Sequence, residues 1–226
     1  MKQGNIHLLW QAGSRYLVGV LLVAALLFLP AGTLHYRNAW LFLALLFLPM
    51  LVLGLVLWLK APGLLEKRLK SKEERSEQKQ GVGVSALMFI GGFVIAGLDH
   101  RFQWSKMPLW LAAAASVLLL LAYGLYAEVM RENAYLSRTV EIQEGQKLID
   151  TGLYGIVRHP MYVATTLLFL AIPLVLGSWV AFLLFLLYPV LMVKRIRNEE
   201  EVLAQGLDGY KEYQKRVKYR MIPLIW

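Results

Sequence analysis

Long apolar runs dominate this sequence, and the last of them is too long to be one straight helix. It covers residues 161–194. As a single α-helix it would extend about 51 Å, whereas the hydrocarbon core of a bilayer is roughly 30 Å thick. Pro173 and the pair Gly177-Ser178 lie near its middle and are typical of a turn. We therefore predict a helical hairpin with arms at 161–176 and 178–194, whose two ends return to one face of the membrane.

Four earlier runs are each long enough for one transmembrane helix, and they lie at residues 17–34, 39–59, 82–98 and 109–127. Hydrophobic residues make up 58% of the chain and charged residues 17%, whereas soluble domains carry about 25% charge. The first run is longer than the apolar part of a secretory signal, so we expect it to be an uncleaved span. We predict an all-α, polytopic membrane helical bundle with about six transmembrane segments and a cytoplasmic C-terminal helix.

The whole chain, residues 1–226, is expected to form one membrane domain. In this interpretation residues 1–127 hold the four N-terminal spans. Residues 128–226 hold the candidate binding loops, the hairpin and the C-terminal tail. The charged stretch 66–80, between the second and third spans, is expected to be a solvated interfacial helix or loop.

The distribution of basic residues predicts the orientation of the spans. Short loops on the cytoplasmic side of a membrane are rich in Lys and Arg. With the predicted hairpin, all 24 Lys and Arg residues fall on one side except Arg37, Arg101 and Lys106. We therefore expect both termini to be cytoplasmic. The net charge of +9 then reflects topology and attraction to anionic lipid headgroups, and it does not indicate a nucleic-acid partner.

Composition also narrows the chemistry that this chain can perform. It has no cysteine, which excludes disulfides, thiolate nucleophiles and Cys-based metal sites. No ionisable residue lies at the middle of a predicted span, which argues against a transporter component. We predict no metal centre, because the histidines are scattered without i,i+4 pairing; they are His7, His35, His100 and His159.

Candidate functional residues lie in three segments that the predicted topology places on the cytoplasmic side. They are residues 132–150, residues 151–162 and residues 194–203. The hairpin brings its own ends together, so the second and third segments should be neighbours and could enclose a pocket. A purely structural interpretation also exists, in which Pro160 only starts a helix and Arg158 only extends to the membrane interface.

The order of the motifs resembles that of a known family. Residues 152–162 read Gly-x-Tyr-x-x-x-Arg-His-Pro-x-Tyr, and Arg195, the pair Glu199-Glu200 and Tyr210-x-x-Tyr213 follow the hairpin. This combination resembles the signature of the isoprenylcysteine carboxyl methyltransferases and of their relatives, the phospholipid methyltransferases. The resemblance covers residues 130–226 in detail, and the first 100 residues match only as apolar spans.

The resemblance implies S-adenosylmethionine as the cofactor, held without a Gly-x-Gly-x-x-Gly motif. It implies that Arg195 and Glu199, which are one helical turn apart, lie nearest the transferred methyl group. The cofactor-binding residues that it implies are Lys147, Leu148, Tyr154, His159, Pro160, Tyr162 and Glu200.

The chemistry of methyl transfer suits such a site. Transfer from a sulfonium is an in-line displacement, to which an enzyme contributes mainly proximity and alignment. Arg195 would orient a carboxylate acceptor through paired hydrogen bonds, whereas Glu199 would act as the base for an amine or thiol acceptor. We predict a membrane methyltransferase acting on a lipophilic or prenylated acceptor among membrane lipids. The alternatives are a phospholipid amine N-methyltransferase and an NADPH-dependent sterol-type reductase.

Overall fold

The computed structural model of the chain describes residues 3–69, 76–136 and 142–226. These residues form helices and connecting loops, with no strand among them, so the predicted all-α fold is confirmed. The elements are α1 (Gln3–Ala31), α2 (Arg37–Lys60), α3 (Pro62–Leu69), α4 (Ser76–Phe102), α5 (Leu109–Glu132), the 3₁₀ helix η1 (Gly152–Gly155), α6 (Pro160–Leu176), α7 (Trp179–Phe185), α8 (Leu187–Gly206) and α9 (Tyr210–Arg216).

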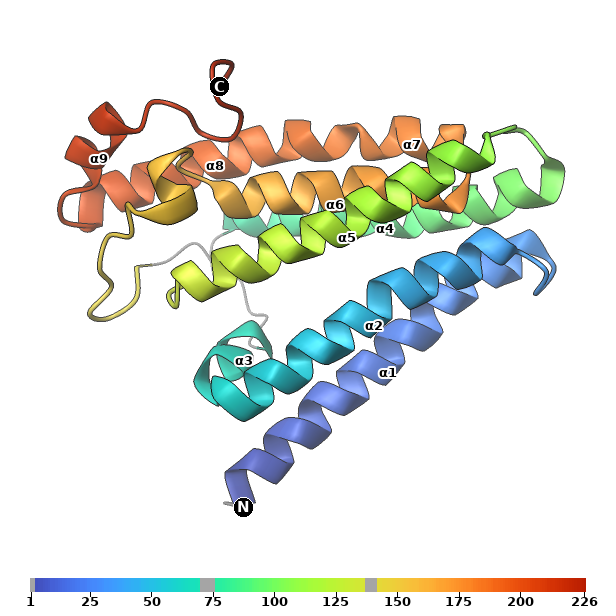
Figure 1. Cartoon of the computed structure of the whole chain (residues 1–226), viewed down its shortest axis with the longest axis horizontal. Helices are drawn as coiled ribbons and strands as arrows, with labels where there is room; N and C mark the ends of the chain where they lie inside the picture. The colour runs from blue at the N-terminus through green and yellow to red at the C-terminus, as the bar shows by residue number, and fades with distance from the viewer. Residues whose placement is uncertain (1–2, 70–75, 137–141) are drawn as a thin grey trace.

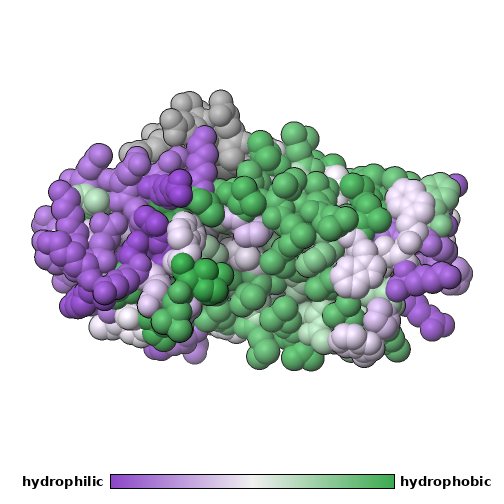
Figure 2. Space-filling model, turned by 90° about the horizontal axis from the view of Figure 1, so that it is seen from above, coloured by the Kyte–Doolittle hydropathy of each residue, from purple (hydrophilic) through white to green (hydrophobic). Residues whose placement is uncertain are grey.

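The helices have the length and composition of membrane spans. Among the described residues, five segments are long and apolar enough to cross a bilayer, and α6 is a shorter apolar helix of 17 residues. Figure 2 shows a broad hydrophobic surface between two hydrophilic ends, of which the larger carries α9. The chain is therefore a multi-pass membrane protein. The five segments are His7–Ala31, Arg37–Lys60, Gly83–Phe102, Leu109–Glu132 and Trp179–Gly206.

The bundle has two distinct ends, which Figure 1 shows to the left and right. The left end carries α3, η1 and α9, and we call it the site end. The turns α1–α2, α4–α5 and α6–α7 lie at the opposite end. Helices α5 and α6 pack along each other, and α4 packs against both α1 and α7. A continuous apolar core that includes Phe42, Leu119, Ile172 and Phe185 holds these helices together and so fixes the positions of α6 and α8.

The predicted turn of the hairpin is present between α6 and α7. Gly177 ends α6 in the left-handed conformation, with φ of 80°, which glycine adopts without steric cost. Ser178 then caps α7, because its side-chain oxygen accepts a hydrogen bond from the backbone N–H of Ala181. The turn is also held from α4, since the buried Asp99 carboxylate accepts hydrogen bonds from the hydroxyls of Ser178 and Ser105.

The second arm of the hairpin is longer than predicted. It was expected to end at residue 194, but α8 continues to Gly206. Hydropathy marks where a chain leaves the lipid, but not where its helix ends, and no proline interrupts the charged residues beyond 194. The arm is also divided between α7 and α8. Pro189 explains this break, because it has no N–H for the carbonyl of Phe185 and its ring crowds that carbonyl.

Other predicted boundaries also need correction. The first helix ends at Ala31 rather than 34, because Gly32 turns the chain with φ of 66° and donates its N–H to the carbonyl of Phe28. The third and fourth predicted spans are parts of longer helices, α4 and α5. The stretch 66–80 contains the end of α3 and the start of α4, and its residues 70–75 lie outside the described residues.

Close packing of α1 against α4 gives a first testable prediction. A Cβ on Gly97 would lie 2.6 Å from the backbone oxygen of Leu27, so one helix would have to move. We expect Gly97→Ala to lower the free energy of unfolding by about 1–3 kcal/mol, the usual cost of overpacking. Thermal unfolding in detergent measures this change. The matched control is Gly124→Ala in α5, where no atom lies within 4 Å, and a Gly97→Ala protein as stable as this control would contradict the prediction.

Candidate functional site

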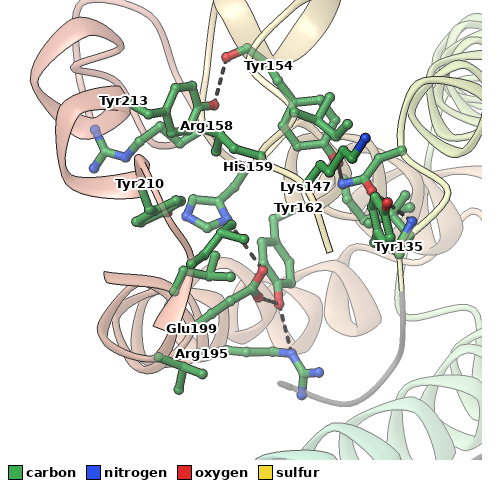
Figure 3. A pocket seen from close by; sticks show the side chains of 18 residues that line it. Tyr135, Lys147, Tyr154, Arg158, His159, Tyr162, Arg195, Glu199, Tyr210 and Tyr213 are labelled. Atoms are coloured by element: carbon green, nitrogen blue, oxygen red, sulfur yellow. Dashed lines mark hydrogen bonds and ion pairs between the residues drawn. The ribbon is translucent and has the colours of Figure 1, made fainter. Parts of the chain in front are cut away.

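A cavity at the site end brings together residues from segments far apart in the sequence (Figure 3). It encloses about 1020 Å³ of space, including its open mouth. The end of α5, the loop before η1, the start of α6, the charged part of α8 and helix α9 all contribute to it. Its polar and aromatic lining residues are Asn133, Tyr135, Lys147, Tyr154, Arg158, His159, Tyr162, Arg195, Glu199, Tyr210 and Tyr213.

The candidate catalytic residues are joined through a third side chain. Tyr162, on the first turn of α6, donates a hydrogen bond from its hydroxyl to Glu199 Oε2, 2.5 Å away. Arg195 Nε donates to the same hydroxyl at 3.0 Å. Arg195 and Glu199 do lie one turn apart on α8, as the spacing predicted. The Tyr162 hydroxyl contacts both of them, however, and Figure 3 shows it joined by dashed lines to Glu199 and to Arg195.

Glu200 is the centre of a buried ionic cluster beside the cavity. Its Oε1 accepts a hydrogen bond from Arg158 Nε at 2.7 Å and lies 3.1 Å from His159 Nε2. Its Oε2 accepts from Arg220 Nε at 2.8 Å. Arg158, His159 and Glu200 are all buried, so Arg158 does not simply extend to the membrane surface. The cluster joins the start of α6 to α8 and to the C-terminal segment.

Two of the residues predicted to bind the cofactor do not line the cavity. Glu200 is not among the residues that line it, and both of its carboxylate oxygens already have partners. Pro160 is buried at the first position of α6 and does not line the cavity either. Lys147, Leu148 and the other predicted residues do line it. The role of each residue toward a cofactor stays a prediction.

The C-terminal segment holds the Arg-His-Pro residues in place. The backbone N–H of Arg158 donates to the carbonyl of Tyr219 at 2.9 Å, and that of His159 donates to the carbonyl of Arg220 at 2.8 Å. These N–H groups precede α6 and have no partner within the helix, so they need acceptors elsewhere. Arg158 adds hydrogen bonds from its guanidinium to the carbonyls of Val217 and Lys218. The chain end thus closes one side of the site.

Tyr154 is positioned by helices on both sides of the cavity. The Glu132 carboxylate, at the end of α5, accepts a hydrogen bond from the N–H of Leu153 at 3.0 Å and so holds η1. Asn133 Nδ2 donates to the Tyr154 hydroxyl at 3.0 Å. From the opposite side, the Tyr213 hydroxyl donates to the Tyr154 carbonyl at 2.7 Å. None of these three partners was assigned a role from the sequence.

An aromatic and apolar cluster forms the part of the cavity next to α9. Tyr210, Tyr213 and Val217 are buried there against Leu148, Leu203 and Leu207. Burial raises the pKa of both tyrosines, and the charges of Glu200 and Glu199 raise that of Tyr210 further, so both hydroxyls stay protonated. Within the described residues, no group of three or more His, Cys, Asp or Glu side chains is arranged to hold a metal ion.

Comparisons with known proteins point to one superfamily. Residues 110–208 match the phospholipid methyltransferase family. The protein-S-isoprenylcysteine O-methyltransferase of Schizosaccharomyces pombe is 34% identical over 107 residues, which are 40% of this chain and 45% of that protein. The uncharacterised protein YpbQ of Bacillus subtilis is 30% identical over 115 residues, which are 50% of this chain and 68% of that protein. The chain belongs to the superfamily of isoprenylcysteine carboxyl and phospholipid methyltransferases.

A solved structure shows that the fold is shared. The eukaryotic intramembrane Ras methyltransferase, an isoprenylcysteine carboxyl methyltransferase, aligns with a TM-score of 0.53 at 18% identity, over 91% of this chain and 73% of that chain. A Delta(14)-sterol reductase of Mus musculus is also similar, with 33% identity over 91 residues, which are 39% of this chain and 22% of the reductase. The chain thus spans less than half of the length of the yeast and mouse relatives.

Proposed function

We propose that this member of the superfamily is an S-adenosylmethionine-dependent membrane methyltransferase with a lipophilic or prenylated acceptor. The observation that carries the proposal is the cavity itself, where the linked side chains of Tyr162, Arg195 and Glu199 meet an aromatic wall at the end of an apolar bundle. The S. pombe relative is a protein-S-isoprenylcysteine O-methyltransferase, so a prenylated cysteine is the first acceptor class. A phospholipid amine is the second acceptor class, because residues 110–208 match the phospholipid methyltransferase family.

The lining of the cavity suits a nucleoside cofactor with a charged end. Ligand cavities commonly combine apolar and aromatic walls with a few convergent polar groups, and this cavity has both. Here the nucleoside would lie near Lys147, Leu148 and Tyr154, and His159 and Tyr162 would line the remainder. The buried, unpartnered hydroxyl of Tyr210 is a polar group for which a bound ligand would supply the partner. When bound, the cofactor supplies an electrophilic methyl group.

Three side chains would then orient the acceptor and, where the acceptor must be deprotonated, accept its proton. Tyr162 holds the guanidinium of Arg195 and the carboxylate of Glu199 in fixed positions through one hydroxyl. A carboxylate acceptor is already a nucleophile, and Arg195 would bind it through charge-assisted hydrogen bonds. An amine or thiol acceptor must lose a proton, and Glu199 would receive it. Both arrangements use the alignment that Tyr162 provides.

We infer further that the site end faces the cytoplasm and that both termini lie there. All Lys and Arg residues except Arg37, Arg101 and Lys106 belong to segments assigned to that side. Figure 2 shows the larger hydrophilic surface at this end. The cofactor would enter from the cytosol, and the apolar tail of the acceptor would remain in lipid while its polar end reaches the cavity.

A calorimetric titration of the detergent-solubilised protein tests the proposed function. We expect S-adenosylhomocysteine to bind and NADPH to give no heat of binding. Absence of S-adenosylhomocysteine binding to folded protein would overturn the methyltransferase proposal. Binding of NADPH alone would favour the sterol-type reductase, the alternative that the similarity to the mouse reductase supports.

A further inference from the structure

Tyr210 is buried, lines the cavity and lacks a hydrogen-bond partner. It is the first residue of α9, and its side chain is almost completely removed from solvent. Its hydroxyl finds no donor or acceptor among the described residues. Most buried side-chain polar atoms in folded proteins have at least one partner, so an exception needs a physical reason. Among the described residues, the Thr166 hydroxyl oxygen is also buried without a partner, but Thr166 does not line the cavity.

We propose that the Tyr210 hydroxyl binds the cofactor, donating a hydrogen bond to an oxygen or nitrogen atom of bound S-adenosylmethionine. This inference rests on the proposed function and adds a binding residue that the motif comparison did not supply. Tyr210 lines the cavity (Figure 3), so a ligand bound against its side chain can supply the partner that the hydroxyl lacks among the described residues.

The surroundings of Tyr210 restrict the orientation of its ring and keep its hydroxyl protonated, as a hydrogen-bond donor to a ligand requires. Its ring packs against that of Tyr213 with a centroid separation of 5.7 Å and against the apolar residues of the α9 cluster, which restricts its orientation. Burial raises the pKa of its hydroxyl, and the nearby carboxylates of Glu200 and Glu199 raise it further. The hydroxyl therefore carries its proton at every physiological pH and offers that proton to a ligand.

Tyr213, one turn later on the same helix, shows the contrasting arrangement. It belongs to the same buried cluster, but its hydroxyl donates to the Tyr154 carbonyl at 2.7 Å. The Tyr213 hydroxyl thus has a partner within the fold, whereas the Tyr210 hydroxyl has none among the described residues. Phenylalanine variants of the two residues remove one oxygen atom each from the same cluster, and so they form a matched pair.

The experiment compares Tyr210→Phe with Tyr213→Phe in two measurements. Thermal unfolding without ligand should show Tyr213→Phe less stable than the wild type, because the Tyr154 carbonyl loses its donor. Tyr210→Phe should unfold at the wild-type temperature or above it, because it removes a polar atom that had no partner. In calorimetry, Tyr210→Phe should bind S-adenosylhomocysteine about 5–20-fold more weakly than the wild type, the loss expected for one hydrogen bond.

The outcomes separate this inference from the proposed function. If the wild type binds S-adenosylhomocysteine and Tyr210→Phe binds it equally well, the inference is wrong and the methyltransferase proposal stands. If Tyr210→Phe loses as much thermal stability as Tyr213→Phe, its hydroxyl has a structural partner and the inference is again wrong. If the folded wild type does not bind S-adenosylhomocysteine, the proposed function fails and this inference fails with it.

Discussion

Glu200→Gln is expected to destabilise the protein by about 3–5 kcal/mol, the usual cost of breaking a buried ion pair by removing one partner. The Glu200 carboxylate accepts from Arg158 Nε at 2.7 Å and from Arg220 Nε at 2.8 Å. Arg158 is buried, so its positive charge would lose compensation in a place that water does not reach. Arg220 is half-exposed and would contribute less. Thermal unfolding in detergent measures the loss.

A control and a double variant make this expectation specific. Glu201→Gln changes the adjacent, exposed carboxylate, and we expect it to alter stability by no more than about 0.5 kcal/mol. Arg158→Met combined with Glu200→Gln should cost less than the sum of the single changes, because each single change leaves the other charge unpaired. Wild-type stability of Glu200→Gln would show that the cluster does not hold the fold together.

The same variant separates two roles for Glu200. The sequence resemblance assigned it to the cofactor, whereas the structure surrounds its carboxylate with Arg158, His159 and Arg220. If Glu200 mainly contacts the cofactor, Glu200→Gln will keep its thermal stability and lose affinity for S-adenosylhomocysteine. If Glu200 mainly stabilises the ionic cluster, Glu200→Gln will lower the unfolding temperature even without ligand. Inactivity of the variant alone would therefore not identify its role.

The helical fold could be predicted because hydropathy and bilayer thickness restrict it so strongly. An apolar run of 34 residues must turn, and Gly177-Ser178 was the place with the chemistry for a turn. The extension of α8 to Gly206 could not be predicted in the same way. Beyond residue 194 the side chains change from apolar to charged, and this change marks the membrane boundary without ending the helix.

The neighbourhood of the site could be predicted, but most of its contacts could not. The hairpin argument placed Arg158-His159-Pro160 beside the start of the charged part of α8, and the cavity lies there. The backbone hydrogen bonds from Arg158 and His159 to residues 219–220 join segments about 60 residues apart, for which a single sequence has no signal. The i,i+4 spacing put Arg195 and Glu199 on one face, but it could not show the Tyr162 hydroxyl between them.

Loss of Glu199 or Arg195 is expected to reduce methyl transfer by at least about 100-fold, within the range that a positioned acid–base group contributes. Glu199→Gln keeps the size of the side chain and removes its charge, and Arg195→Ala removes the guanidinium. Arg195 is not part of the Glu200 cluster, and Glu199 meets it only at His159 Nδ1, 4.0 Å from its Oε1. Both variants should therefore fold and should retain most of their affinity for S-adenosylhomocysteine. Transfer of a labelled methyl group to an acceptor in lipid vesicles measures turnover, with Arg197→Ala on the exposed face of α8 as the control.

The pattern of these losses would also identify the acceptor, because the two residues serve different chemistry. A prenylated cysteine with a free carboxylate needs orientation but no deprotonation, so Arg195→Ala should then reduce kcat more than Glu199→Gln does. A phospholipid amine must lose a proton, so Glu199→Gln should then have the larger effect. Tyr162→Phe removes the hydroxyl that joins the two side chains but keeps the ring that lines the cavity, so in either case it should lower turnover more than it weakens cofactor binding. Wild-type turnover in both Arg195→Ala and Glu199→Gln would contradict the assignment of catalysis to α8.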